Sequence, residues 1–173
     1  MKKTTIKRRI SFHWIRDDEL EAVQDIASAC FAEVGLVAAG ESRIPKWSIG
    51  LPLWDLRVLT EYLETKDRFA KVMTVNREVV GYLFYSLKEH VVVIDQITVD
   101  PEHWRKGYAG RMMQKLKDTM PELRLQIVAA RVSEMNLGTQ LFLRESGFRW
   151  IRTLKGSPSA EDFYLMRWKE MTA

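Results

Sequence analysis

The chain has 173 residues, of which 46% are hydrophobic, so it is long enough to bury a core of its own as one domain. Its 27 basic and 23 acidic residues leave a formal charge of only +4, which does not by itself indicate a nucleic-acid partner. The single cysteine, Cys30, excludes an internal disulfide, and no stretch approaches the roughly 18 consecutive apolar residues of a membrane span. We therefore expect one soluble domain over residues 1–173, without a membrane segment or signal peptide, in the cytoplasm.

The first predicted element is an edge strand that follows a basic segment. The segment contains five basic residues: Lys2, Lys3, Lys7, Arg8 and Arg9. Ile10, Phe12 and Trp14 then alternate with polar residues, as in a strand with one buried face. A solvated edge strand and a phosphate-binding patch are both compatible with this pattern, but edge strands commonly carry lysine. Since the aromatic residues are not interleaved with basic ones as in a base-stacking surface, we expect no nucleic-acid partner.

Two helices are predicted next, with a long loop between them. The first begins near Asp18, with Asp17 as its N-cap, and ends before Gly35. The stretch from Val34 to Pro52 contains three glycines and two prolines, which predicts an irregular loop. The second helix is expected from about Asp55 to Glu64.

Three strands and a basic turn follow. The strands are predicted over Phe69–Val75, Val79–Leu87 and Val91–Val99, joined by turns at Asn76-Arg77 and Glu89-His90. Pro101 ends the third strand. In the turn after it, Gly107, Ala109 and Gly110 remove side-chain bulk, while Arg105 and Lys106 supply positive charge before an amphipathic helix begins. This arrangement predicts a phosphate or pyrophosphate site at a helix N-terminus.

The turn resembles motif A of the GNAT superfamily of acetyl-CoA-dependent N-acetyltransferases, Gln/Arg-x-x-Gly-x-Gly/Ala after a strand that ends in Val-x-Pro. Val99-Asp100-Pro101, Gly107 and Ala109 match, whereas Trp104 stands where the family has Gln or Arg. A second similarity lies downstream. There a predicted strand over Leu125–Val132 is followed by Asn136, a helix from about Leu137 to Arg144, and Gly147-Phe148. The resemblance covers about Phe69 to Lys169.

This resemblance implies the fold and the cofactor. The expected α/β fold is a mixed, mostly antiparallel sheet of about seven strands flanked by helices, in the order β-α-α-β-β-β-α-β-α-β-β. Its last strands would lie near Phe148–Leu154 and Asp162–Trp168. The implied co-substrate is acetyl-CoA. Its pantetheine arm would bond the backbone of Ile97, Thr98 and Val99, and its pyrophosphate would lie on Arg105, Lys106, Gly107, Tyr108, Ala109 and Gly110. Asn136 would bind the pantetheine or phosphate arm, and it is also a natural helix N-cap.

The implied activity is transfer of an acetyl group to a primary amine of a small molecule or peptide. Within the superfamily, the sequence most resembles the ribosomal-protein N-terminal acetyltransferases. However, Arg131 replaces their glutamate base and Leu143 replaces their tyrosine acid. Two other hypotheses stay open: an acyl-CoA-binding module without catalysis, and a nucleic-acid-binding accessory protein. A homodimer is compatible with the resemblance. No metal is expected, because His13, His90 and His103 are far apart in sequence.

Replacements for the missing acid and base come from strand geometry. Period-two alternation places Asp95 on one strand face with Val93 and Ile97, and Gln96 on the other with Ile94 and Thr98. Asp95 is a candidate base or one partner of a structural salt bridge. Glu134 is a second candidate base or a solvated loop residue, and Tyr164 and Tyr85 are candidate acids or core residues.

Overall fold

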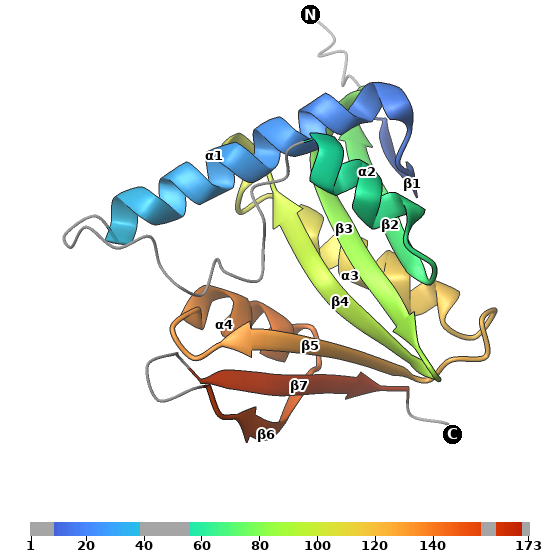
Figure 1. The fold of residues 1–173 in the computed structure, drawn as a ribbon, viewed down its shortest axis with the longest axis vertical. Helices are drawn as coiled ribbons and strands as arrows, with labels where there is room; N and C mark the ends of the chain where they lie inside the picture. Colours follow the sequence, from blue (N-terminus) through green and yellow to red (C-terminus); the bar gives the residue numbers. More distant parts are fainter. Residues whose placement is uncertain (1–8, 39–55, 157–161, 171–173) are drawn as a thin grey trace, which may run out of the picture.

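A twisted sheet forms the centre of the molecule (Figure 1). The computed structural model describes residues 9–38, 56–156 and 162–170. Within them the strands are β1 (Ile10–Trp14), β2 (Arg68–Val75), β3 (Glu78–Lys88), β4 (Val91–Val99), β5 (Ile127–Ser133), β6 (Arg149–Leu154) and β7 (Phe163–Lys169). Their spatial order is β1-β2-β3-β4-β5-β7-β6, and every neighbouring pair is antiparallel except β4 and β5. The predicted seven-stranded mixed sheet is confirmed.

Helices cover both faces of this sheet (Figure 1). They are α1 (Leu20–Ala38), α2 (Leu56–Glu64), α3 (Tyr108–Thr119) and α4 (Leu137–Glu145), with short 3-10 turns η1 (Asp17–Glu19) and η3 (Pro101–His103). Residues of α1 and α2 belong to one buried cluster, and residues of α3 and α4 belong to the other. The two pairs of helices therefore pack on opposite faces of the sheet. The chain order of strands and helices therefore matches the one implied by the sequence resemblance.

The start and end of α1 differ from the prediction. Asp17 belongs to η1, whose N-cap is Arg16, and Glu19 carries the local hydrogen bonds. Its Oε2 accepts from the Arg16 backbone N–H at 2.9 Å, and its Oε1 lies 2.8 Å from His13 Nε2. The helix also continues past Gly35 to Ala38, since one glycine costs only about 1 kcal/mol in a helix interior. Residues 34–38 of the predicted loop are therefore helical, and residues 39–55 lie outside the described part of the chain.

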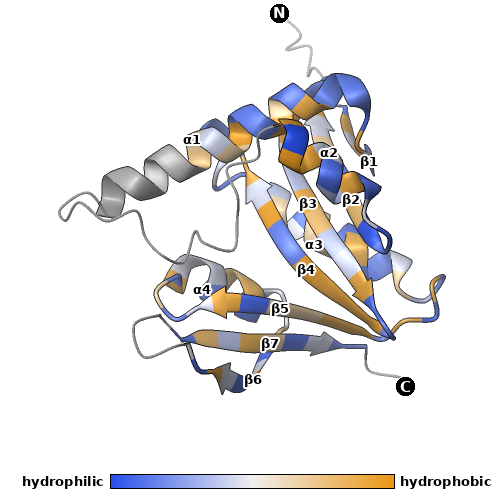
Figure 2. Ribbon diagram, viewed as in Figure 1, coloured by the Kyte–Doolittle hydropathy of each residue, from blue (hydrophilic) through white to orange (hydrophobic). Residues whose placement is uncertain are grey.

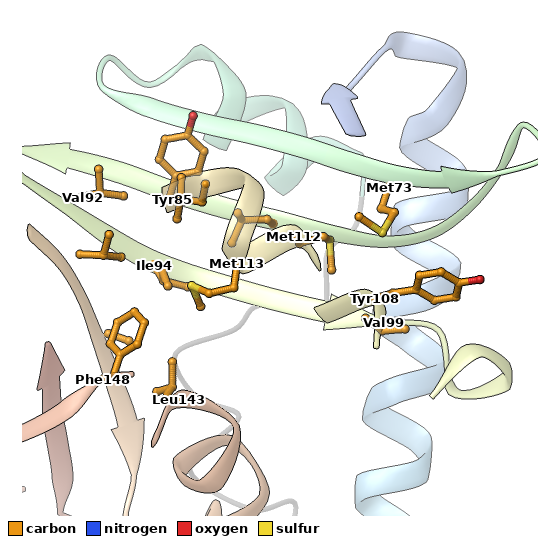
Figure 3. Packing of buried hydrophobic residues seen from close by; sticks show 14 of the residues in the cluster. Met73, Tyr85, Val92, Ile94, Val99, Tyr108, Met112, Met113, Leu143 and Phe148 are labelled. Carbon is orange, nitrogen blue, oxygen red and sulfur yellow. The ribbon is translucent and has the colours of Figure 1, made fainter. Parts of the chain in front are cut away.

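Each sheet face buries its own apolar cluster. Under α1 and α2, the aromatic rings of Tyr62 and Phe84 stack with centroids 5.2 Å apart. On the other face, Met112, Met113 and Leu116 of α3 are all buried against the sheet, as Figure 3 shows for the two methionines. In Figure 2, hydrophobic residues recur along β3 and β4, interrupted by a hydrophilic segment in the middle of β4.

Gly81 in β3 provides a test of the packing between β3 and β4. A Cβ atom at this position would lie 2.6 Å from the Thr98 carbonyl oxygen and 3.2 Å from Met112 Cε. Because backbone has to move, Gly81→Ala should lower the free energy of unfolding by about 1–3 kcal/mol. Urea denaturation measures this change.

The matched control for that substitution is Gly138→Ala in α4. The nearest atom to an added Cβ there, Asn136 Oδ1, is 3.9 Å away, so the substitution meets no obstruction. Alanine should instead stabilise the helix by about 0.5–1 kcal/mol. Equal stability of Gly81→Ala and the unsubstituted protein would contradict the proposed close approach of the two strands.

Candidate functional site

Strands β4 and β5 separate partway along their length. Their parallel pairing joins Val91–Ile94 to Ile127–Ala130 and ends there, although both strands continue. Figure 1 shows the resulting divergence in the middle of the sheet. Beyond Ile94, one edge of β4 therefore has no neighbouring strand among the described residues, while its other edge stays paired with β3 through Val99.

Backbone groups of Ile97 and Val99 face this open edge. The Asp100 N–H donates to the Val80 carbonyl of β3 at 3.0 Å, so the planar peptide directs the Val99 carbonyl the opposite way. Because successive residues of a strand direct their backbone N–H and C=O groups to opposite sides, those of Thr98 point to β3 and those of Ile97 point to the open edge. The contact that a Gly81 Cβ would make with the Thr98 carbonyl agrees with this direction. The prediction that Thr98 offers its backbone to the pantetheine arm is therefore wrong, because β3 uses these groups.

Two side chains already donate to the Val99 carbonyl. Trp104 Nε1 lies 2.6 Å from this oxygen, and Cys30 Sγ of α1 lies 3.3 Å from it. Trp104, which replaces the usual Gln or Arg of the motif, thus fixes the end of β4 to the turn that follows. The Cys30 contact is not predictable from local sequence, because the two partners are 69 residues apart.

The turn after β4 leads into an uncapped helix N-terminus. Gly107 is the N-cap of α3 with φ 77°, and no side chain caps the helix. A Cβ at Gly107 or Gly110 would meet nothing within 4 Å, so the space beside the backbone at these two residues is open. The first-turn N–H groups have no intrahelical acceptors, and the exposed Arg105 and Lys106 add positive charge. These features are those of an anion site.

Tyr108 contributes differently from its neighbours in the turn. Its side chain is buried, beside Val99 and Met112 in Figure 3. The ring packs against His103 with centroids 6.1 Å apart, and the Arg111 guanidinium lies 5.9 Å from its centroid. Only the backbone N–H of Tyr108 is therefore suited to an anion, and the side chain anchors α3 to the core.

A β-bulge at Asp95 changes the face on which the residues after it lie. Phe84 pairs with Gln96 and Tyr85 pairs with Ile94, so Asp95 is the extra residue in β4. Phe84 packs under α1 and α2, which places its partner Gln96 on that face, and Ile97 packs toward α3. The predictions that Ile97 shares a face with Asp95 and that Ile94 shares one with Gln96 are therefore wrong, because the bulge adds one residue.

Asp95 is held at the divergence by neutral hydrogen-bond donors. Tyr62 Oη donates to Asp95 Oδ2 at 2.8 Å, and Ser86 Oγ donates to Oδ1 at 3.2 Å. Asp95 is exposed, and no cationic side chain of the described residues lies within 4 Å of it. The salt bridge considered from the sequence is thus not found in this part of the chain. Neither donor is among the site residues that the sequence predicts.

Two tyrosines, Tyr62 and Tyr85, predict how folding stability depends on pH. Burial raises the pKa of Tyr85 to about 12, and burial together with the hydrogen bond to Asp95 raises the pKa of Tyr62. In the unfolded chain both groups ionise near pH 10, so above this pH the folded state binds more protons than the unfolded state.

The free energy of unfolding should accordingly be constant just below about pH 10 and fall as the pH rises toward about 12. Urea denaturation across this range, with tyrosinate absorbance as a second signal, measures the effect. Tyr85→Phe should flatten the decline. An unchanged slope in that variant would contradict the assignment to Tyr85.

Sequence comparison identifies the family. The sequence profile described as "Acetyltransferase (GNAT) family" matches residues 20–148, most of the chain. The chain belongs to the GNAT acetyltransferase family. A search of curated proteins finds no match.

Solved structures share the GNAT fold over nearly the whole chain. The ribosomal-protein-S18-alanine N-acetyltransferase of Escherichia coli has a TM-score of 0.68 at 13% identity, covering 95% of this chain and 96% of its own. The PaiA N-acetyltransferase of Thermoplasma acidophilum, in complex with coenzyme A, has a TM-score of 0.74 at 15% identity. The match covers 94% of this chain and 99% of PaiA. A chimera of the spermidine N-acetyltransferase SpeG from Vibrio cholerae has a TM-score of 0.69 at 14% identity. The match covers 92% of this chain and 95% of the chimera. At these identities the likeness shows the fold.

Asn136 of this GNAT protein is a helix N-cap. Its Oδ1 accepts from the Thr139 backbone N–H of α4 at 3.0 Å. This confirms the capping function considered from the sequence. The amide nitrogen Nδ2 is still able to donate to a ligand, so the proposed contact with acetyl-CoA is compatible with the cap.

The structure does not bring the other catalytic candidates to Asp95. Glu134 lies at the end of β5, where its Oε1 accepts from the Asp162 backbone N–H at 3.2 Å. Tyr164 packs on the α3 and α4 face, opposite Asp95, and lines a groove with Leu141 of α4. Tyr85 is buried under α3.

Neither a metal-binding cluster nor a membrane-spanning helix is found in the described residues. No group of three or more His, Cys, Asp or Glu side chains is placed to hold a metal ion in this part of the chain. Nor does any helix there have the length and apolar character needed to cross a membrane.

Proposed function

We propose that this protein transfers the acetyl group of acetyl-CoA to a primary amine, by direct attack of the amine within a ternary complex. The observation that carries the proposal is the position of the open β4 edge directly before the uncapped N-terminus of α3. A strand edge can bond the amides of an extended arm, and a helix N-terminus can bind the pyrophosphate at its end. Coenzyme A has both parts in this order.

The residues present fit acetyl-CoA. Ile97 and Val99 would bond the pantetheine arm through backbone groups, with the Val99 N–H as donor because its carbonyl already accepts from Trp104 and Cys30. The amides from Lys106 to Gly110 would hold the pyrophosphate, and Asn136 Nδ2 would donate to the arm. Acetyl-CoA supplies the activated acyl thioester when bound.

Asp95 is the proposed general base. It would accept a proton from the incoming ammonium, directly or through a water molecule, while Tyr62 and Ser86 hold its two oxygens. The neutral amine then forms a C–N bond with the thioester carbonyl carbon, the C–S bond breaks, and the amine nitrogen loses its second proton to solvent. The thiolate takes a proton from solvent, since Leu143, at the position of the usual tyrosine, is buried and has none to donate. The products are an N-acetylated amine and coenzyme A.

Solved relatives support an amine acceptor. One of them is described as a ribosomal-protein-S18-alanine N-acetyltransferase, another as a spermidine N-acetyltransferase, and PaiA was solved with coenzyme A. Their acceptors differ from one another, so the acceptor of this chain has to be argued from its own residues.

Calorimetry with acetyl-CoA, followed by thiol release with a panel of amines and peptide N-termini, tests the proposal. We expect acetyl-CoA to bind and an amine to accelerate thiol release. Binding without release by any amine would favour the alternative, an acyl-CoA-binding protein without catalysis. Absence of binding below millimolar concentration would overturn both.

A further inference from the structure

Two opposite charges stand where β4 and β5 part. Ile94 and Ala130 form the last pair between these strands, and the residues that follow them are Asp95 and Arg131. The side chain of Asp95 faces α1 and α2, because it contacts Tyr62 of α2. The position of Arg131 therefore decides whether an acceptor bound beside Asp95 would also meet a positive charge.

Arg131 lies on the same sheet face as Asp95. Its neighbours in β5, Ala130 and Val132, are buried in the cluster under α3 and α4, so alternation places Arg131 on the opposite face. There it is exposed, and its guanidinium carbon lies 4.6 Å from the centroid of the Phe163 ring of β7. The aromatic ring thus supports the guanidinium and restricts its orientation.

The charge of Arg131 has no carboxylate partner among the described residues. No Asp or Glu oxygen in this part of the chain lies within 4 Å of it, whereas the exposed Arg57 pairs with Glu61 at 3.1 Å. A stacked guanidinium keeps its N–H groups available in its plane and stays charged at any physiological pH. Its natural ligand is a carboxylate, which it can bind through two parallel hydrogen bonds.

We propose that the acceptor amine carries a carboxylate, as a free amino acid does, and that Arg131 binds it. The inference rests on the proposed function, since it takes Asp95 to lie next to the amine. Paired strands are about 4.8 Å apart, but here β4 and β5 diverge, Asp95 contacts Ser86 of β3 and the guanidinium leans toward β7, so the two charges are separated by more than one strand spacing. An α-amino acid with one hydrogen bond at each end spans about 8–9 Å.

A polyamine does not fit this site as well. Arg167 of β7 pairs with Ala129 and lies on the same face as Arg131, so a second positive charge stands nearby. An acceptor with several ammonium groups would be repelled by both arginines, whereas a zwitterion has one charge for each side of the divergence.

The experiment compares acids with their amides in a binding assay that does not need turnover. Calorimetry in the presence of coenzyme A measures the affinity of N-acetyl amino acids and N-acetyl amino acid amides, which resemble the two possible products. We expect the best acids to bind about 10–100-fold more tightly than their amides, since each hydrogen bond to a charged group is comparatively strong. Arg131→Gln should abolish the preference. Arg152→Gln, an exposed residue of the edge strand β6, is the matched control and should retain it.

Three results would overturn the inference: equal binding of acids and amides, a preference that persists in Arg131→Gln, and failure of every acid to bind. Thiol release with the free amino acids and their amides separates this inference from the proposed function. If acids bind through Arg131 but no amino acid, other amine or peptide N-terminus accelerates thiol release, the carboxylate site stands and the acetyltransferase proposal fails. If amides are acetylated as fast as acids, the activity stands and the carboxylate site fails.

Discussion

Replacing Asp95 by asparagine is expected to lower the turnover of acetyl transfer by about 100-fold or more, because a general base contributes at least this factor. Asparagine has nearly the same shape and keeps one oxygen to accept from Tyr62 or Ser86, so the bulge should persist. It cannot take a proton from the ammonium. The affinity for acetyl-CoA should not change, since Asp95 lies on the α1 and α2 face and the proposed pyrophosphate site is at the N-terminus of α3. Thiol release at saturating acceptor and calorimetry with acetyl-CoA measure the two quantities.

Glu134→Gln is the control for this prediction. Glu134 is the other candidate carboxylate, and its hydrogen bond with the Asp162 backbone N–H can be made equally by a glutamine oxygen. Turnover should therefore stay within about threefold of the unsubstituted protein, because an exposed structural contact of this kind contributes little. If Glu134→Gln is inactive and Asp95→Asn is active, the assignment of the base is wrong.

Most of the strands around the site are predictable because local signals agree with the tertiary structure. Val91–Val99 is short, apolar and β-branched, and the strand has the predicted bounds. Pro101 and the small residues of the turn prevent the strand from continuing, so the chain turns before α3. The Asn136 cap is predictable for the same reason, since its hydrogen bond lies within four residues.

The environment of Asp95 is not predictable in this way. Alternation assumes one residue of β4 for each residue of β3, and the bulge between Ile94 and Gln96 breaks this assumption. Nothing local in Val91–Val99 marks the extra residue, because the bulge depends on pairing with β3. The donors to Asp95 come from Tyr62 and Ser86, respectively 33 and 9 residues away in sequence. Long-range contacts of this kind, like that of Cys30 with Val99, follow only from the folded sheet.

The second large effect is expected at the turn before α3, where Gly110→Glu should weaken acetyl-CoA binding by about 10–100-fold through repulsion between the carboxylate and the phosphates. Gly110 is in the first turn of α3, and a Cβ there meets nothing within 4 Å, so a side chain fits without moving the backbone. A glutamate in a first helical turn also interacts favourably with the helix dipole, and it replaces a glycine of poor helix propensity. Folding stability should therefore stay equal or increase while affinity falls.

This opposite response separates a binding defect from a folding defect. Gln114→Glu adds the same charge to α3 one turn further from its N-terminus, on an exposed residue whose amide contacts Asp118. It should reduce acetyl-CoA affinity by less than about threefold, because the repulsion decreases with distance and is screened by salt. Calorimetry at two salt concentrations measures both variants, and the defect of Gly110→Glu should be smaller at the higher concentration. If Gly110→Glu binds acetyl-CoA as tightly as the unsubstituted protein, the phosphates do not lie at the N-terminus of α3.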